Sequence, residues 1–279
     1  MKRKVKTKVK GFRTTDGAGV KLVRVLGNLT TKEFDPILML DSFDSINPDD
    51  YTAGFPMHPH RGIETISYVS RGKMVHRDSL GNEAGISDGE VQWMNSGSGI
   101  MHEEMVPAAE RLLGVQLWLN LPAKDKMSKP SYNSIKNEDI KEIEIEGGKI
   151  RLLAGKYGEH EGYKGDYLSM DYYDIHLNAD AEVTLTMEED DSVMVFTLLG
   201  DVYIDGEHIE EKIAVKLTEG DSLTIKNGNE KAQVLYMNSR ALNEPVAWAG
   251  PIVMNTQEEL QKAFLELRSN TFIKETAEY

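Results

Sequence analysis

The chain has 279 residues, of which 40% are hydrophobic and 28% charged, so it is long enough to form about two domains with buried cores. It contains no cysteine, which excludes disulfides, thiolate metal sites and cysteine nucleophiles. Any bound metal must therefore be held by histidine and carboxylate side chains. The formal net charge of −14 argues against direct, sequence-independent binding to nucleic acid or to an anionic membrane.

The chain begins with a basic segment, MKRKVKTKVK. The alternation of Val5 and Val9 with lysines predicts a strand with a charged solvent face. No apolar segment follows it, which argues against a signal peptide. No stretch of the chain approaches the ~20 apolar residues that are needed to span a membrane. We therefore expect a cytoplasmic protein.

Strand patterns dominate the rest of the chain. Residues 64–80 alternate apolar and polar side chains around a turn at Arg71-Gly72. Turn pairs such as Asp88-Gly89 and Asp205-Gly206 recur at intervals of about 8–12 residues, which is typical of a β-sandwich or a small barrel. Further strands are expected at Leu112–Leu119, Gly148–Ala154, Val183–Met187 and Ser192–Leu199.

The two halves of the chain resemble each other. A strand that ends at Gly72 is followed by a second strand that opens at Gly89, and the same order recurs at Gly200 and Gly220. This weak repeat indicates two copies of one unit. The segment Ala123–Asn137 is poor in apolar residues and is the best candidate for a linker between them.

One helix is expected near the C-terminus. Thr256 can cap its first turn, and Glu259 completes a capping box. The apolar stripe that should pack against the rest of the protein has helical spacing and consists of Leu260, Ala263, Phe264 and Leu267.

Four polar side chains have the spacing of metal ligands on strands. His58 and His60 are two residues apart, as are His102 and Glu104, so each pair lies on one face of a strand. If the two strands are neighbours, three imidazoles and one carboxylate converge, a set that suits Fe(II), Mn, Co, Ni, Cu or Zn. The Gly-rich turn 96–99 before His102 supports a close approach of the backbone. The alternative is a pair of surface strands with exposed histidines.

Six motifs carry a resemblance to the pirin family of bicupins, and the resemblance extends over nearly the whole chain. It implies an all-β fold of two tandem cupin-type β-barrels with a C-terminal helix. We expect residues 1–130 to form the metal-binding barrel, and residues 138–279 to form a barrel without metal ligands together with the helix. The motifs are His58–Thr65, His76–Asn82, Gly89–Met94, Gly97–Glu104, Gln116–Pro122 and Gly250–Thr256.

The resemblance also implies roles for individual residues. In pirins the carboxylate ligand stands two residues after the later histidine, which is Glu104 here. The wider cupin motif H-x-H-x₃-E would instead use Glu64, and strand parity alone leaves that choice open; the pirin pattern favours a structural role for Glu64. Glu103 points to the opposite strand face from Glu104, and His76 is expected to be a hydrogen-bonded strand residue rather than a fifth ligand.

The second repeat lacks such a set. When its glycines are aligned with those of the first repeat, Thr186 and Glu188 stand at the positions of the histidine pair, and Gln233 stands at the position of His102. We therefore expect the second barrel to pack and to enclose rather than to bind metal. The remaining histidines are isolated from one another in the sequence: His160, His176 and His208.

The resemblance implies one divalent transition metal, Fe(II) first among the candidates, and a quercetin 2,3-dioxygenase activity. A flavonol-like substrate would bind the metal through its 3-hydroxyl, Glu104 would accept the proton as catalytic base, and O₂ would open the ring. Candidate walls of the pocket are Trp93, Met94, Met101 and Trp118.

The alternative is a non-catalytic, iron-binding and redox-responsive regulator. The acidic chain argues against direct contact with DNA, so such a regulator would act through a protein partner. We expect a monomer, since a bicupin completes its sheet pairing within one chain.

Overall fold

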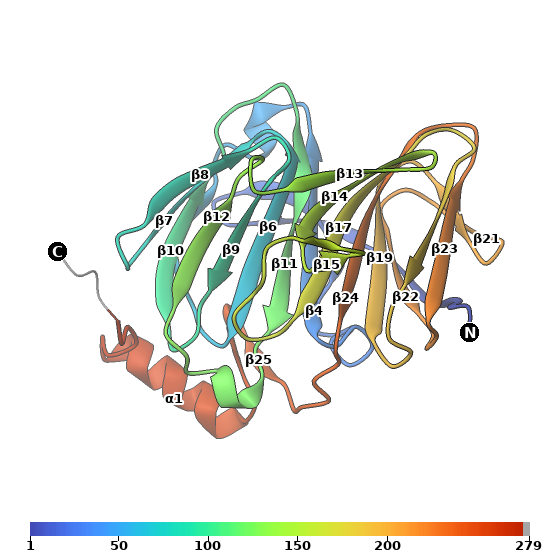
Figure 1. Cartoon of the computed structure of the whole chain (residues 1–279). Coiled ribbons are helices and arrows are strands. Elements are labelled where there is room, and N and C mark those ends of the chain that lie inside the picture. Colours follow the sequence, from blue (N-terminus) through green and yellow to red (C-terminus); the bar gives the residue numbers. More distant parts are fainter. Residues whose placement is uncertain (276–279) are drawn as a thin grey trace. The chain divides into compact units, whose positions relative to one another are not determined.

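A computed structural model describes residues 1–275 of the chain (Figure 1). The fold is all-β apart from two short 3₁₀ turns and α1 (Gln257–Arg268), the one α-helix in the described range. It divides into two compact units. No helix among the described residues is long and apolar enough to cross a membrane.

Each end of the chain belongs to the unit formed mainly by the other half of the sequence. The N-terminal unit comprises Phe12–Thr31, Ile37–Lys136 and the chain from Leu242 onward. The C-terminal unit comprises Met1–Gly11, Lys32–Pro36 and Asn137–Ala241. The expected boundaries, 1–130 and 138–279, therefore differ from this division at both ends. Long-range strand pairing decides the ends, and such pairing is invisible to local sequence patterns.

The N-terminal unit contains two antiparallel sheets. The larger sheet has the order β12-β9-β6-β11-β4-β3-β2 and the smaller one the order β5-β10-β7-β8. The strands of the larger sheet are β2 (Phe12–Asp16), β3 (Val20–Leu26), β4 (Ile37–Ser45), β6 (Ile63–Arg71), β9 (Glu90–Asn95), β11 (Leu112–Asn120) and β12 (Ser131–Ile135). Those of the smaller sheet are β5 (Phe55–His60), β7 (Lys73–Asp78), β8 (Glu83–Ser87) and β10 (Ile100–Met105).

The C-terminal unit has the same plan. Its larger sheet has the order β1-β22-β19-β24-β17-β14-β13 and its smaller sheet the order β18-β23-β20-β21. The larger sheet contains β1 (Val5–Lys10), β13 (Lys141–Ile145), β14 (Gly148–Ala154), β17 (Met170–Leu177), β19 (Ser192–Leu199), β22 (Ile213–Leu217) and β24 (Ala232–Ser239). The smaller sheet contains β18 (Glu182–Thr186), β20 (Val202–Ile204), β21 (Glu207–Ile209) and β23 (Ser222–Asn227).

Short elements complete the chain. Two-stranded ribbons are formed by β15 with β16 and by β25 with β26. The 3₁₀ turns η1 and η2 both lie in the N-terminal unit. Their bounds are β15 (Lys156–Tyr157), β16 (His160–Glu161), β25 (Ala247–Ala249), β26 (Ile252–Met254), η1 (Pro48–Asp50) and η2 (Ala123–Asp125).

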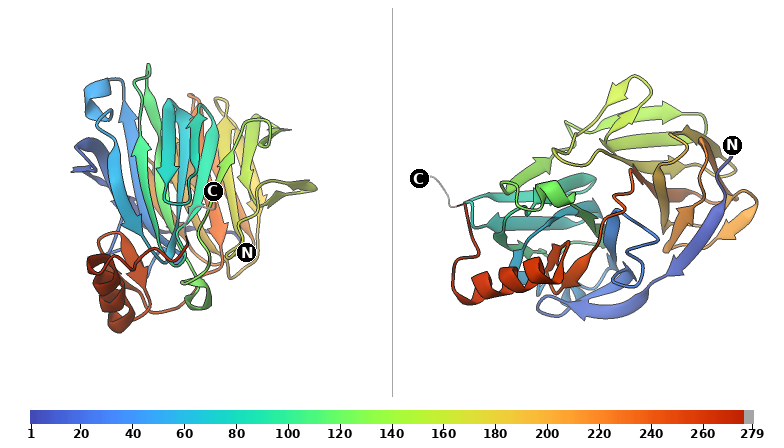
Figure 2. Two further views of the ribbon diagram at one scale, coloured as in Figure 1. Left: turned by 90° about the vertical axis from the view of Figure 1, so that its left-hand side faces the viewer. Right: turned by 90° about the horizontal axis from the view of Figure 1, so that it is seen from below.

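The two sheet orders correspond strand by strand. Within the larger sheets β6, β11 and β4 match β19, β24 and β17, and within the smaller sheets β5-β10-β7-β8 matches β18-β23-β20-β21. The predicted repeat is therefore a repeat of topology, and the expected fold of two cupin units is confirmed. The basic first segment forms β1 as expected, and Val9 pairs with Ala214 of β22. Figure 2 shows this blue strand running beside the orange strands.

Each unit has an apolar core between its two sheets. In the C-terminal unit Leu223 from the smaller sheet and Ile150 from the larger one belong to the same buried cluster. In the N-terminal unit Met74 and Phe43 do the same. Burying apolar surface on one face of each sheet stabilises these packed layers.

The C-terminal helix is built as its sequence predicts. The Thr256 hydroxyl accepts a hydrogen bond from the Glu259 backbone N–H at 3.2 Å, and the Glu259 carboxylate accepts one from the Thr256 N–H at 2.9 Å. This capping box satisfies two of the N–H groups that a helix start leaves without partners. Leu260 and Ala263 bury their side chains in a cluster with Ile252 and Met254.

Candidate metal centre

Two neighbouring strands bring three histidines together. β5 carries His58 and His60, and β10 carries His102. The strands pair antiparallel, with His58 directly opposite His102, so the condition for convergence of the two segments is met. His60 is 3% exposed and His102 is 1% exposed, while His58 is half-buried.

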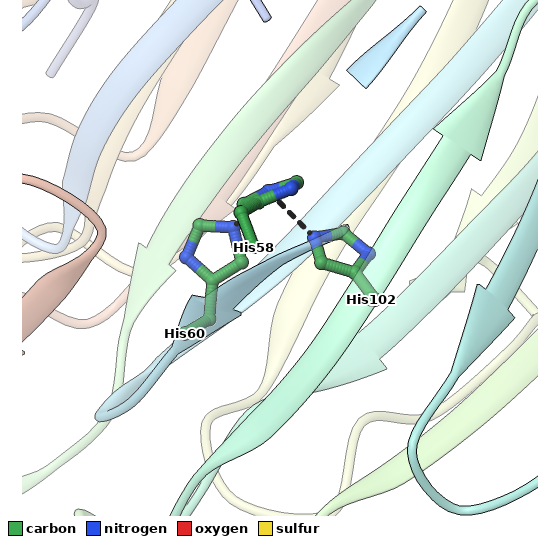
Figure 3. A group of neighbouring side chains, drawn as sticks. All are labelled: His58, His60 and His102. Carbon is green, nitrogen blue, oxygen red and sulfur yellow. Dashed lines mark hydrogen bonds between the residues drawn. The ribbon is translucent and has the colours of Figure 1, made fainter. Parts of the chain in front are cut away.

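The three rings face one another, as Figure 3 shows. The Nε2 atom of His58 lies 3.0 Å from Nε2 of His60 and 3.0 Å from Nε2 of His102. Nitrogen ligands about 2.1 Å from a metal and at right angles to each other are separated by about 3.0 Å. The spacing of these atoms therefore matches the edge of a coordination shell.

The outer nitrogen of two rings is fixed by a backbone carbonyl. His58 Nδ1 lies 2.8 Å from the carbonyl oxygen of Pro56, and His60 Nδ1 lies 2.9 Å from that of Pro251. A carbonyl oxygen can only accept a hydrogen bond, so each Nδ1 carries the hydrogen. In the neutral imidazole the lone pair is then on Nε2. Two acceptors at 3.0 Å have no hydrogen between them, and a cation at that point would satisfy both.

Burial disfavours the protonated form of the His60 and His102 rings. Burial, with His58 as a second cause, lowers the pKa of His60 to about 3. The pKa of His102 also lies well below its usual range, first because of burial and then because of the neighbouring histidines. Metal ions bind only the unprotonated imidazole nitrogen. The residues present thus fit a divalent transition metal.

Glu104 shares β10 with His102 but is not a member of the close group of histidine ligand atoms. Among the described residues the group of ligand atoms within 4.8 Å of one another consists of His58, His60 and His102. The Glu104 side chain is buried on β10, and its carboxylate accepts hydrogen bonds from the amide of Gln116 at 2.9 and 3.1 Å and from the amide of Gln92. The carboxylate is therefore oriented within the same unit by two neutral donors.

Glu64 is separated from the histidine pair by a turn. β5 ends at His60, and Glu64 stands on β6, so the two positions do not share a strand. Gly62 has a φ of +79°, and a Cβ there would lie 2.0 Å from the Val253 carbonyl oxygen. The strand parity that would have allowed Glu64 to join the histidines does not apply across this turn.

Glu266 and Phe272, near the end of the chain, bind Arg61, which directly follows the strand of His58 and His60. We call these two residues the strap. The guanidinium of Arg61, which is 2% exposed, donates to the carbonyl oxygens of Ser98 and Phe272 at 2.7 and 2.9 Å. It also pairs with Glu266 at 2.8 Å and lies 4.1 Å from the centre of the Phe272 ring. The sequence analysis did not identify Arg61. Its place directly after the histidine pair was the available signal, but its partners Glu266 and Phe272 lie some two hundred residues away along the chain.

The expected linker Ala123–Asn137 is largely ordered structure instead. It forms η2 and then β12, which pairs with β9 on the larger sheet. Lys126 is buried, and its ammonium donates to the carbonyl oxygens of Gly62 at 2.7 Å and Val253 at 3.2 Å and to the Asn120 side chain. Burial lowers the pKa of Lys126 to about 7. This polar segment packs inward at Lys126 because oxygen atoms of Gly62, Asn120 and Val253 accept hydrogen bonds from its ammonium group.

The candidate wall residues are mostly buried. Trp93, Met94 and Trp118 are less than 10% exposed, and Met101 is half-buried. The Trp118 ring meets the His60 ring edge-on, with centroids 5.1 Å apart and planes at 82°. His76 is the hydrogen-bonded strand residue that was expected, with Asp78 and His102 as its side-chain partners.

The C-terminal unit has apolar side chains at the corresponding strands. β18 and β23 are the counterparts of β5 and β10, and their buried pairs are Val183 with Ile225 and Leu185 with Leu223. Of the expected counterparts, Thr186 does lie on β18, the counterpart of β5. Glu188 falls beyond the end of that strand, and Gln233 lies on β24, the counterpart of β11 and not of β10. The ungapped alignment missed the different loop lengths of the two units.

The fold and the site together define a two-unit cupin protein with a three-histidine centre in its first unit. A family model described as Pirin matches residues 19–119, and one described as Pirin C-terminal cupin domain matches residues 172–273. A relative from Pseudomonas aeruginosa, named "Putative quercetin 2,3-dioxygenase", is 39% identical over 268 residues, with 92% of this chain and 94% of the relative covered. The chain belongs to the pirin family.

Solved structures show the same fold. A quercetin 2,3-dioxygenase from Acinetobacter baumannii superposes with a TM-score of 0.89 and 29% identity, covering 98% of this chain and 99% of that one. A bacterial pirin from Escherichia coli, in complex with nickel(II), has a TM-score of 0.67 and 19% identity over 84% of this chain and 98% of its own. The second likeness concerns the fold alone.

Proposed function

We propose that the chain is a metal-dependent dioxygenase that opens the ring of a flavonol. The metal is bound by His58, His60 and His102 through Nε2, with Glu104 as the fourth ligand. The observation that carries this proposal is the convergence of three histidine rings, two of them buried and one half-buried. Backbone carbonyls on the far side of two of these rings hold their Nε2 atoms as acceptors.

The proposed native metal is Fe(II). Three imidazoles and one carboxylate accept several first-row divalent ions, and availability decides among them. The Escherichia coli pirin was solved with nickel(II), which supports a divalent metal in this family without fixing its identity. Glu104 stands two residues after His102 on β10 and is the carboxylate of this strand that is buried inside the unit.

The bound metal would supply Lewis acidity toward the 3-hydroxyl of the flavonol and a position for O₂. Glu104 would accept the hydroxyl proton, because it is the buried carboxylate of β10 two residues from His102, and the amides of Gln92 and Gln116 hold it in place. Trp118, edge-on to His60, offers an apolar surface for the aromatic rings and limits water there. Flavonol and O₂ are consumed, and a ring-opened ester and carbon monoxide are released.

Aerobic turnover of quercetin tests the proposal. Purified protein is stripped of metal, reloaded with Fe(II), and mixed with quercetin while the flavonol absorbance and carbon monoxide release are followed. We expect the absorbance to fall with the loaded protein, and not with His102→Ala or with stripped protein. His208→Ala, at an exposed histidine of the C-terminal unit, is the control and should retain the full rate.

A fully metal-loaded protein that leaves quercetin intact would overturn the activity on this substrate class. The metal-binding part of the proposal is tested separately, by elemental analysis of the same samples. Metal binding without turnover would favour the second candidate function, a metal-responsive regulator that acts through a protein partner.

A further inference from the structure

The motif His76–Asn82 lies beside the metal centre and supplies none of its three histidines. It spans the end of β7 and the turn that follows, and β7 pairs with β10 so that Asp78 stands opposite His102. The His76 side chain is completely buried. Neither the fold nor the proposed ligand set accounts for a buried His and Asp at this place.

A chain of hydrogen bonds runs from this motif to the metal centre. His102 Nδ1 lies 3.3 Å from His76 Nδ1, and His76 Nε2 lies 2.9 Å from an Asp78 carboxylate oxygen. The Asp78 carboxylate also accepts hydrogen bonds from the backbone N–H groups of Leu80 and Asn82 at 2.9 and 3.1 Å and from the Asn82 side-chain amide at 2.9 Å. The motif therefore holds its own carboxylate in place.

When His76 is a neutral imidazole, the donors and acceptors of this chain can point in only one direction. Asp78 receives three N–H groups besides that of His76, so it acts as an ionised acceptor. Burial acts to raise the pKa of Asp78, but the hydrogen bonds from His76 and Asn82 outweigh it, and the pKa lies below its usual range. His76 must then donate from Nε2 and accept at Nδ1. His102 consequently donates from Nδ1, which leaves its Nε2 lone pair for the metal.

We propose that His76 and Asp78 are positioning residues that fix the ring orientation and the tautomer of His102. They do for His102 what the carbonyls of Pro56 and Pro251 do for the other two histidines. Tyr132 stacks on the His76 ring, with centroids 4.0 Å apart and planes 11° apart, and so fixes the plane of the relay. The positioning role rests on the proposed function, because the tautomer of His102 matters only if His102 binds a metal. The hydrogen bonds themselves are present in the structure.

The tautomer is measurable in the metal-free protein. A free neutral histidine favours the Nε2–H form, so an Nδ1–H form at His102 reports the acceptor behind it. Long-range ¹H–¹⁵N spectra of the apo protein should show His102 with hydrogen on Nδ1. His76→Phe keeps an aromatic ring against Tyr132 but removes the acceptor, and should shift His102 to the Nε2–H form. His76→Gln, whose amide oxygen can accept, should restore the Nδ1–H form.

Metal affinity provides the second readout. Loss of an outer-shell partner typically weakens metal binding about 10–100-fold, and we expect a loss in this range for Ni²⁺ binding to His76→Phe, with partial recovery in His76→Gln. A matched control exists in the C-terminal unit, where His176 contacts Asp174 at 2.7 Å with the same spacing in sequence. Asp174→Asn should leave Ni²⁺ affinity unchanged.

The outcomes separate this inference from the proposed function. An Nε2–H tautomer at His102 in the wild-type apo protein overturns the positioning role, and this measurement needs no variant to fold. The role is also overturned if folded His76→Phe retains the Nδ1–H form or binds Ni²⁺ as tightly as the wild type. If the wild type shows the expected tautomer but binds no metal, the proposed function fails while the hydrogen-bond relay stands.

Discussion

The two cupin units share one strand plan but differ in what fills the space between their sheets. In the N-terminal unit β5 and β10 place His58, His60 and His102 there. In the C-terminal unit the matching strands place paired apolar side chains, Leu185 with Leu223 among them. The same frame thus accommodates a histidine cluster beside an apolar core in one unit and apolar side chains alone at the matching strands of the other, and a few inward-facing positions decide which forms.

The surroundings of those positions differ too. A histidine needs an acceptor at its outer nitrogen to present Nε2, and the N-terminal unit supplies carbonyl oxygens and the His76–Asp78 relay for this purpose. An aliphatic side chain needs only neighbours of complementary shape. A metal centre therefore requires a second layer of residues that an apolar core does not.

The largest expected effect is the loss of metal on removal of a central ligand. His102→Ala deletes one of three converging nitrogens, and we expect Ni²⁺ affinity to fall by more than the about 100-fold typical of outer-shell changes. Isothermal titration of the apo protein measures this. His176→Ala in the C-terminal unit should bind Ni²⁺ as the wild type does, and equal losses in both variants would contradict the assignment of the site.

A buried arginine in each unit sharpens the comparison. Arg61→Ala removes a guanidinium that pairs with Glu266 and two carbonyl oxygens, and should cost about 3–5 kcal/mol in the free energy of unfolding. It should also weaken metal binding, because the strap holds the strand that carries His60. Urea titration and Ni²⁺ binding measure the two effects.

The matched control is Arg3→Ala. Arg3 is also 2% exposed, and it donates to four carbonyl oxygens of the C-terminal unit, those of residues 188, 189, 191 and 218. This variant should destabilise its unit and leave metal affinity intact. A loss of metal in Arg3→Ala, or its retention in Arg61→Ala, would remove the link between the strap and the site.

The apolar interior of the second unit should respond as a core. Leu223→Ala is expected to lower the free energy of unfolding by about 2–5 kcal/mol, because it removes buried methyl groups and leaves a cavity. Thermal and urea unfolding measure this, and Ni²⁺ affinity should not change. A change below about 0.5 kcal/mol, the usual range for surface substitutions, would show that this position is not a core position.

The smallest expected effect concerns the helix cap. Thr256→Ala removes the hydroxyl that accepts from the Glu259 N–H, and should cost about 1 kcal/mol in the free energy of unfolding. Thr256→Ser keeps the acceptor and is the control. Equal stability of the alanine variant and the wild type would mean that packing of Leu260 and Ala263 alone holds the helix.

Local patterns predicted part of the histidine cluster and the start of the helix. The spacing of His58 and His60 fixed their common face, and the capping box predicted the start of α1. The role of Glu64 could not be settled in this way, since the parity argument assumes an unbroken strand and β5 ends before the turn at Gly62. The boundary between the units does fall at the end of the expected linker, between residues 136 and 137, but most of the segment is ordered. Its polar composition does not reveal that Lys126 has buried oxygen acceptors.

The sequence by itself determined which side chains share a strand face and which ligand chemistry is available, because these follow from a period of two residues and from the absence of cysteine. The tertiary structure decided which partners those side chains meet. His60 finds the Pro251 carbonyl 191 residues away, and Arg61 finds that of Phe272 at a separation of 211 residues. Local geometry is fixed by the backbone of neighbouring residues, whereas such contacts depend on how the whole chain closes on itself.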